Sequence, residues 1–403
     1  MTFKISSHTQ MIRYKYLGLS ILNALSILFV CYLADNWSYS VLTGPSIGQR
    51  IELFKTYSGL SSEPDLDDYV FINIAYDKEL VPVYDDYGFK KGEIDVTNRV
   101  YLNEFLSQIK DSHKYIIFDV LLSKNYKSPY DSILIETILD TDRIVIAHSE
   151  KEVLPDVRLK NKSGFSDYST HLLETNFVKY EFLKNDSSTL ASKAYLDITH
   201  SPKVNKIGPF YIKNGHLQWK ALTLRFPIKL WDNSYTEEDK DDNKFKEDRI
   251  FNLGTEILDL GIDIPTMIKD KIVVIGDFTE DDIHDTYMGK IAGPVINVNA
   301  LEALRNNELE IPWWLIIGLF ILYTFITYVL LRRISFFNVL NKLKLNKPLL
   351  RYIISFIGFS VFFGFIGGII YITSGKDINI LIPAILFTCL KWIIYRSWQI
   401  TKV

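Results

Sequence analysis

Four long apolar segments stand out from the polar background of this chain, one near its start and three near its end. They cover residues 17–34, 312–331, 352–373 and 378–396. About 20 helical residues cross the ~30 Å hydrocarbon core of a bilayer, so the pattern predicts four transmembrane helices. A cleaved signal peptide is the alternative for the first segment. Lys391 weakens the fourth prediction, because its charge must snorkel to the membrane surface.

The charges between the apolar segments predict an orientation. The loop 332–351 carries several basic residues and no acid, whereas the next loop holds only Lys376 and Asp377. The positive-inside rule therefore places 332–351 in the cytoplasm. With four spans, the tails 1–16 and 397–403 are then cytoplasmic too, and 35–311 lies outside. We expect a multi-pass protein of the cell inner (plasma) membrane, in contact with the lipid bilayer.

Between the first two spans the pattern alternates between short, β-rich apolar runs and helical periodicity. Helices are expected at 97–112, with Thr97 as a candidate cap, and at 130–140 and 297–307. The predicted strands are 69–77, 114–123, 143–149 and 270–277. This alternation is typical of an α/β domain with a largely parallel sheet and flanking helices.

Two stretches of this external domain are less regular. Residues 150–215 predict short strands and turns. Residues 232–249 are highly charged and lack apolar periodicity, which indicates a solvated insertion. This insertion does not match a calcium-binding loop, because Lys244 stands where the turn needs glycine and Ile250 where the bidentate acid belongs.

Small residues recur at four-residue spacing in the third apolar segment, at Ser360, Gly364 and Gly368. Small side chains let helix backbones approach closely in a membrane. We expect helix packing here, either within the cluster of C-terminal spans or between two copies in a homodimer.

Composition limits the chemistry. The formal net charge is −3, without the basic excess of a nucleic-acid-binding protein. The two cysteines, Cys31 and Cys389, both lie in predicted spans, so we expect no disulfide framework and no cysteine metal site outside the membrane. The histidines are dispersed, and no hydrolase elbow or phosphate-binding glycine loop occurs. We therefore expect no metal, no cofactor and no enzymatic activity.

Acidic residues end several predicted strands, where ligands bind in open parallel sheets. The candidate ligand-binding residues are Asp77, Asp119, Asp277 and, in the loop after the last strand, Asp285. For the acids at strand ends, the capping of a nearby helix or turn is the structural alternative. A dense loop of Asp281, Asp282, His284 and Asp285 follows the last strand. It could bind a metal or ligand, or simply be solvated.

The runs YVFINIAYD, YIIFDVLLS, KDKIVVIGDFTEDDIHDTYMGKIAGP and NVNALEALRNN occur in that order and are followed by the three C-terminal spans. This arrangement resembles the type 2 CHASE domain, an extracellular sensory domain associated with bacterial histidine kinases and nucleotide cyclases. The resemblance covers roughly 35–310. It aligns Asp77, Asp119 and Asp285 with family acids, and Gly276 and Gly293 with family glycines.

The resemblance implies a bacterial transmembrane sensor for an unknown cue. Family members usually continue into a cytoplasmic kinase, cyclase or phosphodiesterase, whereas only a short segment follows the last span here. We therefore expect the signal to pass to a separate signalling or effector protein at the 332–351 loop. The alternatives are a membrane effector that acts by assembly of its spans and an extracytoplasmic hydrolase.

Overall fold

The computed structural model describes residues 7–36, 47–58, 60, 66–85, 87–110, 112–125, 127–167, 179–184, 187–224, 228, 250–261, 263–279, 281–334 and 348–400. The predicted insertion 232–249 and most of the basic loop 332–351 lie outside these residues. The chain divides into two compact units. One combines residues 1–54, 204–221 and 308–403, and the other combines residues 55–203 and 222–307.

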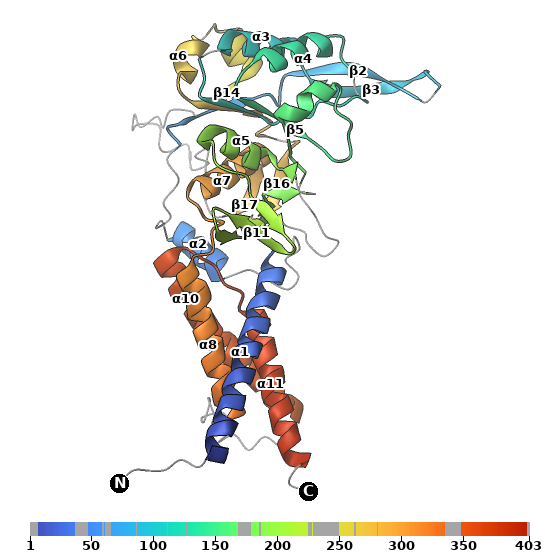
Figure 1. Cartoon of the computed structure of the whole chain (residues 1–403). Helices are drawn as coiled ribbons and strands as arrows, with labels where there is room; N and C mark the ends of the chain where they lie inside the picture. The colour runs from blue at the N-terminus through green and yellow to red at the C-terminus, as the bar shows by residue number, and fades with distance from the viewer. Residues whose placement is uncertain are drawn as a thin grey trace, which may run out of the picture. The chain divides into compact units, whose positions relative to one another are not determined.

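The second unit contains a six-stranded parallel sheet, which confirms the predicted α/β class (Figure 1). Its strands, in spatial order, are β14 (Ile250–Asn252), β1 (Tyr69–Asn73), β15 (Ile272–Gly276), β4 (Tyr115–Phe118), β5 (Ile144–His148) and β6 (Ser163–Phe165). The four predicted strands are its four inner strands. The two edge strands are only three residues long, too short to give a periodic pattern.

The crossover helices all pack on one face of this sheet. Each connection, β1 to β4, β4 to β5, β5 to β6 and β14 to β15, moves in the same direction across the sheet. Right-handed crossovers that share a direction must lie on the same face. They are α3 (Arg99–Ile109), α4 (Asp131–Asp140), η2 (Val157–Lys162), η3 (Leu253–Leu258) and α6 (Ile264–Ile268). Their buried side chains form one core with alternate strand residues such as Ile72, Ile116 and Val273.

The other face is covered by α5 (Leu190–Thr199) and α7 (Gly293–Arg305). The strand residues that point this way include Tyr69 and Tyr115. The Tyr69 hydroxyl donates to Glu302 of α7, and the Tyr115 hydroxyl donates to Asp197 of α5 over 2.7 Å. The α5 helix falls in the stretch for which the sequence predicted only short strands and turns.

Two hairpins extend from the carboxyl edge of the sheet, because each directly follows a strand. β2 (Lys78–Tyr84) and β3 (Lys90–Thr97) follow β1, and β16 (Ile283–Thr286) and β17 (Gly289–Ala292) follow β15. The predicted helix 97–112 starts later than expected, and its cap is Asn98 rather than Thr97: the Asn98 side chain accepts from the backbone of Val100 and Tyr101. The remaining short strands of this region are β7 (Lys179–Glu181), β8 (Leu183–Lys184), β9 (Ser187–Ser188) and β13 (Ala221–Thr223).

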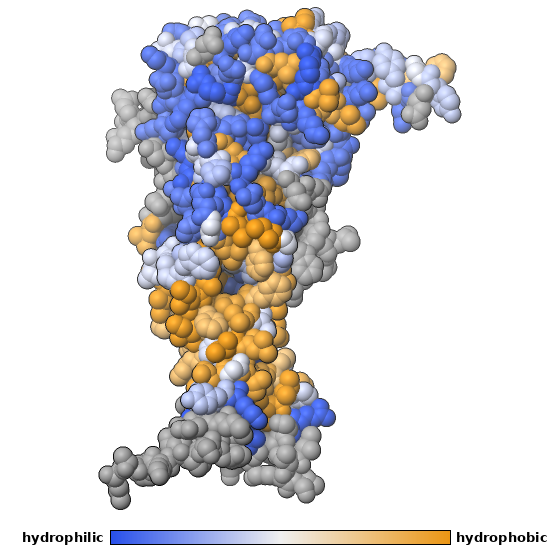
Figure 2. Space-filling view, viewed as in Figure 1, coloured by the Kyte–Doolittle hydropathy of each residue, from blue (hydrophilic) through white to orange (hydrophobic). Residues whose placement is uncertain are grey.

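The first unit is built on apolar helices, and Figure 2 shows apolar side chains gathered over them. The four predicted segments fall in α1 (Ser7–Asp35), α8 (Trp313–Leu331), α10 (Pro348–Ser374) and α11 (Leu381–Ile400). Three stretches are long and apolar enough to cross a membrane: Tyr14–Asp35, Trp313–Leu331 and Leu349–Ser374. The apolar part of α11, Leu381–Ile394, is shorter than a typical span.

Polar side chains within this bundle pair across helices. Asn23 of α1 donates to the Thr327 hydroxyl of α8 over 2.8 Å. Lys391 of α11 donates to the Ser355 hydroxyl of α10 over 3.0 Å. Each pair gives polar atoms of an otherwise apolar bundle a hydrogen-bond partner.

The small residues of α10 face α2 (Ile47–Tyr57), a helix outside the three-helix cluster. A Cβ on Gly364 would lie 3.3 Å from the Ile47 side chain, and one on Gly368 would lie 3.9 Å from it. Helices α2 and α10 make two further contacts. Gly48 of α2 lies against the Tyr371 ring of α10, and the Tyr371 hydroxyl donates to Glu52 of α2 over 2.6 Å. Within this chain, Gly364 and Gly368 therefore pack against α2 rather than against a neighbouring span. Ser360 makes no hydrogen bond through Oγ within the described part of the chain.

A small antiparallel sheet belongs with the helices rather than with the α/β unit. It consists of β10 (Asn205–Ile207), β11 (Phe210–Lys213) and β12 (His216–Gln218). Tyr32 of α1 holds it in place. The Tyr32 hydroxyl accepts from the Tyr211 backbone over 3.0 Å and donates to the Gln218 carbonyl over 3.1 Å, and its ring stacks on Phe210 and Trp219. The predicted external domain 35–311 is thus not one compact body.

Tyr32→Phe should loosen this small sheet, because it removes both hydrogen bonds and keeps the stacked ring. Each hydrogen bond of this kind contributes about 1 kcal/mol, so the loss of two should make amide exchange in residues 205–218 roughly thirtyfold faster. Hydrogen-exchange mass spectrometry on the full chain measures the change. Tyr14→Phe, at an exposed position of the same helix, is the matched control and should leave the exchange unaltered. Unchanged exchange in Tyr32→Phe would contradict the anchoring role.

Candidate functional site

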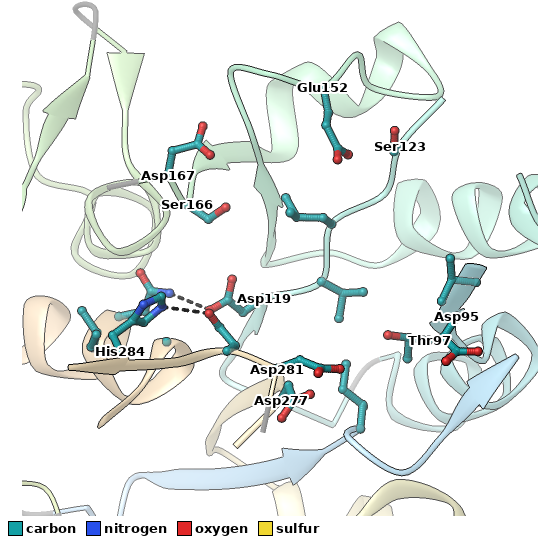
Figure 3. Close-up of a pocket in the computed structure, with 18 of the residues that line it drawn as sticks. Asp95, Thr97, Asp119, Ser123, Glu152, Ser166, Asp167, Asp277, Asp281 and His284 are labelled. Carbon is teal, nitrogen blue, oxygen red and sulfur yellow. Dashed lines mark hydrogen bonds and ion pairs between the residues drawn. The ribbon is translucent and has the colours of Figure 1, made fainter. Parts of the chain in front are cut away.

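A cavity of about 430 Å³ lies at the carboxyl edge of the parallel sheet in the second unit. After β4 the chain turns to α4 on one face, whereas after the neighbouring strand β15 it turns to α7 on the other. Neighbouring strands whose connections diverge in this way leave a crevice where ligands bind in open sheets. The charged and polar side chains around it are drawn in part in Figure 3. They are Lys78, Asp95, Thr97, Arg99, Asp119, Ser123, Glu152, Ser166, Asp167, Tyr180, Asp277, Asp281, Asp282, His284 and Asn297.

A chain of hydrogen bonds orients Asp119, the residue that directly follows β4. The Ala191 backbone N–H donates to the Tyr180 hydroxyl over 3.2 Å, and that hydroxyl donates to Asn297 Oδ1 over 2.9 Å. The Asn297 amide must then present its N–H groups to Asp119, and Nδ2 donates to Asp119 Oδ2 over 2.7 Å. Asn297 is the one donor to this carboxyl among the described residues. The other oxygen, Oδ1, is left for the cavity.

Burial, with the nearby Asp282 carboxylate as a second cause, raises the pKa of Asp119 to about 8. The Asn297 hydrogen bond opposes this shift. Asp119 is therefore largely protonated at neutral pH. Since Oδ2 accepts from Asn297, the proton resides on Oδ1, and the carboxyl presents a donor on its free side.

Asp282 lies beside Asp119 and packs against the start of α7. Its Oδ1 accepts from His284 Nε2 over 2.9 Å, and its backbone carbonyl accepts from the Gly293 N–H over 2.7 Å. A Cβ on Gly293 would lie only 2.0 Å from Asp282 Oδ2, so only glycine permits this approach. The carboxylate also gains from the positive end of the α7 dipole.

Asp277, which directly follows β15, lies near Lys78, the one lysine among the described residues of the cavity wall. Lys78 Nζ is 3.6 Å from Asp277 Oδ2 and 3.1 Å from Asp281 Oδ2. Asp277 Oδ1 accepts from the Thr279 backbone over 2.9 Å. Lys78 therefore places a positive charge close to both carboxylates.

Arg99, the first residue of α3, contributes a buried positive charge to the wall. Its side chain is 2% exposed, and its Nε donates to Asp131 Oδ1 over 3.1 Å. Burial lowers the pKa of this guanidinium despite the carboxylates of Asp131 and Glu79. Its Nη1 has no hydrogen-bond partner among the residues that the structure describes.

Two of the four predicted ligand-binding acids, Asp119 and Asp277, come together in this cavity. Asp77 does not line it; its carboxylate accepts from the Gly254 N–H over 3.1 Å at the start of η3, and burial raises its pKa. Its role is the structural capping considered above. Asp285 is exposed on β16, on the opposite side of that strand from His284, and does not line the cavity either.

Several residues of the cavity were not predicted from the sequence as site residues. Asn297 was placed on a predicted helix but not in a site, and Tyr180 and Arg99 carried no motif. Asn297 stands four residues after Gly293, so a helix that begins at the Gly-Pro pair would have placed it one turn from that glycine. Arg99 gave no signal, because its burial depends on how α3 packs against Asp131.

Within the described residues, no group of three or more His, Cys, Asp and Glu side chains could hold a metal ion. The carboxyls, amide and guanidinium around the cavity can instead bind a polar organic molecule by hydrogen bonds and charge. No family model matches the chain, and neither a curated protein nor a solved structure is significantly similar to it.

The second unit should lose stability as the pH rises from about 4 to about 8. The folded-state pKa of Asp119 lies above its unfolded value, so the folded state binds a proton in this window that the unfolded state has released. Each unit of pKa difference corresponds to about 1.4 kcal/mol, which makes even part of the shift measurable. Amide exchange of the β4 and β15 peptides as a function of pH, corrected for the intrinsic rate, reports it.

Asp119→Asn keeps the acceptor for Asn297 and removes the titration, so it should flatten this pH dependence. Asp140→Asn makes the same change at an exposed surface site and serves as the control, which should keep the wild-type profile. An unaltered slope in Asp119→Asn would show that another group dominates.

Proposed function

We propose that this protein is a bacterial transmembrane sensor: its α/β unit detects a cue outside the cytoplasm, and its membrane helices pass the signal to a separate partner. One observation carries the proposal. Helix α7 supplies Gly293, Ile296 and Asn297 to the cavity at its first turns, and its chain continues within a few residues into α8 at Trp313. Helix α7, which lines the cavity, is thus joined by a short segment to α8, a helix long and apolar enough to span a membrane.

The segment that joins α7 to α8 is held firmly within the first unit. Trp219 N–H donates to the Leu309 carbonyl over 2.8 Å, and Ile311 N–H donates to the Leu217 carbonyl over 2.9 Å. Lys376, between α10 and α11, donates to the Glu308 carbonyl over 3.1 Å. A displacement of residue 308 is therefore transmitted to the small sheet anchored on α1. It is also transmitted to the ends of α10 and α11 that flank Lys376.

The charges of the loops support the direction of the signal. The basic 332–351 loop favours the cytoplasm, which puts both chain ends inside and the α/β unit outside the inner membrane. This loop is then the proposed contact for a signalling or effector partner. The resemblance to type 2 CHASE domains, and the cavity at the carboxyl edge of the sheet, agree with a sensory role.

The membrane-effector alternative drew on the small residues of α10 as an assembly surface. Gly364 and Gly368 instead contact Ile47 of the same chain, so that motivation weakens. We do not favour a hydrolase, because the serine hydroxyls of the cavity wall, Ser123 and Ser166, hydrogen-bond to backbone groups and not to a histidine base in the described residues.

Cysteine labelling tests the orientation. In a Cys31→Ala, Cys389→Ala background, a membrane-impermeant maleimide should label Lys91→Cys, on the exposed strand β3, in cells whose outer layer is permeabilised. Lys342→Cys, in the basic loop, should react only after the inner membrane is broken. The opposite pattern would place the α/β unit in the cytoplasm and refute the sensor topology.

Coupling between cavity and loop can be tested without a known cue. Asn297→Ala removes the donor to Asp119 and should change the maleimide reaction rate of Lys342→Cys in open membranes by about fivefold or more, the lower range of allosteric coupling. A short Gly-Ser insertion between Asn307 and Glu308 should abolish this effect. Asp140→Asn should leave the rate unchanged. An Asn297→Ala effect that survives the insertion, or no effect at all, would contradict transmission through α7.

A further inference from the structure

We propose that the seam between α10 and α11, at Ser355 and Lys391, binds the phosphate group of an anionic phospholipid. Lys391 supplies the positive charge, and the Ser355 hydroxyl supplies a second donor beside it. This inference goes beyond the sensor function and does not depend on it. It requires only that the apolar helices lie in a lipid bilayer.

Lys391 is a charged residue within the apolar stretch Leu381–Ile394 of α11. Its Nζ donates to the Ser355 hydroxyl of α10 over 3.0 Å. Ser355 is only 8% exposed, and Lys391 is partly buried. An ammonium group has three donors, so one bond to a neutral hydroxyl leaves two donors and the whole charge without compensation.

The depth of this pair puts it within reach of a lipid headgroup. The apolar stretch Leu349–Ser374 of α10 has 26 residues and is about 39 Å long at ~1.5 Å per residue, against ~30 Å for the hydrocarbon core. A centred helix therefore leaves about 4–5 Å of each end among the headgroups. Ser355 is six residues beyond Leu349, about 9 Å along the helix, so it lies only a few ångströms below the headgroups. A charge at this depth is costly unless it is paired.

The chain supplies no carboxylate at this end of the helices. Helices α1 and α10 begin here, and α8 and α11 end here (Figure 1). The sequence has no Asp or Glu in residues 1–34, 311–376 or 378–403. Asp377 lies between α10 and α11 at their opposite ends, and the remaining acids belong to segments joined at the opposite ends of α1 and α8. The counter-charge for Lys391 must therefore come from another molecule.

Lipid reaches both helix segments that form the seam. Exposed apolar side chains flank it on α10, at Ile353 and Ile357, and on α11, at Trp392 and Ile393. Acyl chains can lie along this surface while the headgroup lies at the seam. Basic sites between membrane helices are known to bind anionic headgroups in this manner.

The hydrogen bonds of the pair match a phosphate. The Ser355 oxygen accepts from Lys391, and its own hydrogen has no acceptor among the residues that the structure describes. Phosphate oxygens can accept from this hydroxyl and from the two further donors of Lys391. Bonds from a cation to an anionic oxygen are the stronger kind, and a phosphate also neutralises the charge.

Titration with an anionic lipid tests the proposal. The full chain is placed in phosphatidylcholine nanodiscs with increasing fractions of phosphatidylglycerol. Native mass spectrometry measures the phosphatidylglycerol that the chain retains, and the thermal unfolding midpoint should rise with it. Lys391→Met keeps a long side chain without the charge and should weaken retention about tenfold, because it removes a charge-assisted hydrogen bond. Lys391→Arg keeps a cation and should retain the lipid.

Lys15→Gln is the matched control, because it removes an exposed cation from the same end of the helix bundle. It should leave retention as in the wild type. An equal loss in Lys15→Gln and Lys391→Met would mean that the basic surface as a whole attracts the lipid, and would overturn the proposed site. So would a wild-type chain that retains phosphatidylglycerol no better than phosphatidylcholine.

Two further measurements keep the outcome clear. The unfolding midpoint in pure phosphatidylcholine shows whether Lys391→Met folds. If it does not, Ser355→Ala decides the site, since the loss of one neutral hydrogen bond should weaken retention about fivefold and no loss would contradict the seam. Inorganic phosphate added to phosphatidylcholine nanodiscs should not raise the midpoint. A rise equal to that with phosphatidylglycerol would replace the lipid by a soluble phosphate.

Discussion

The common direction of the sheet crossovers is the constraint on which the rest of the α/β unit depends. Because each right-handed connection advances the same way, five helical segments share one face of the sheet. The opposite face is left for α5 and α7. After β15 the chain therefore crosses to the face of α7, whereas after β4 it crosses to the face of α4. The crevice between these two connections holds Asp119 and Asp277.

Helix α7 joins three roles that are usually separate. It buries Tyr69 against Glu302, it fixes the Asp119 carboxyl through Asn297, and its chain leads into α8. Burial and the nearby Asp282 raise the pKa of this carboxyl, so a positive group placed beside it would change its charge. The proposed sensor function depends on this electrostatic link between the cavity and α7.

The helical unit shows how polar and small residues define packing where hydrophobicity alone cannot. Its helices are apolar on most sides, so burial does not distinguish one partner from another. Specific contacts do: Asn23 with Thr327, Lys391 with Ser355, and the glycines of α10 with Ile47. Tyr32 adds a small sheet that the chain supplies from a distant segment, residues 204–221.

The sequence by itself determined the α/β class, the four inner strands, the main helices and the apolar segments, because burial periods of two and 3.6 residues and long apolar runs are local signals. It also placed Asp119 and Asp277 at strand ends. Only the tertiary structure decided that Asp77 caps η3, that Asp282 rather than Asp285 faces the cavity, and that Asn297, Tyr180 and Arg99 belong to it. These outcomes depend on which strands are neighbours in the sheet and on which side of the β16–β17 hairpin each side chain points. Both are set by contacts between residues far apart in the chain.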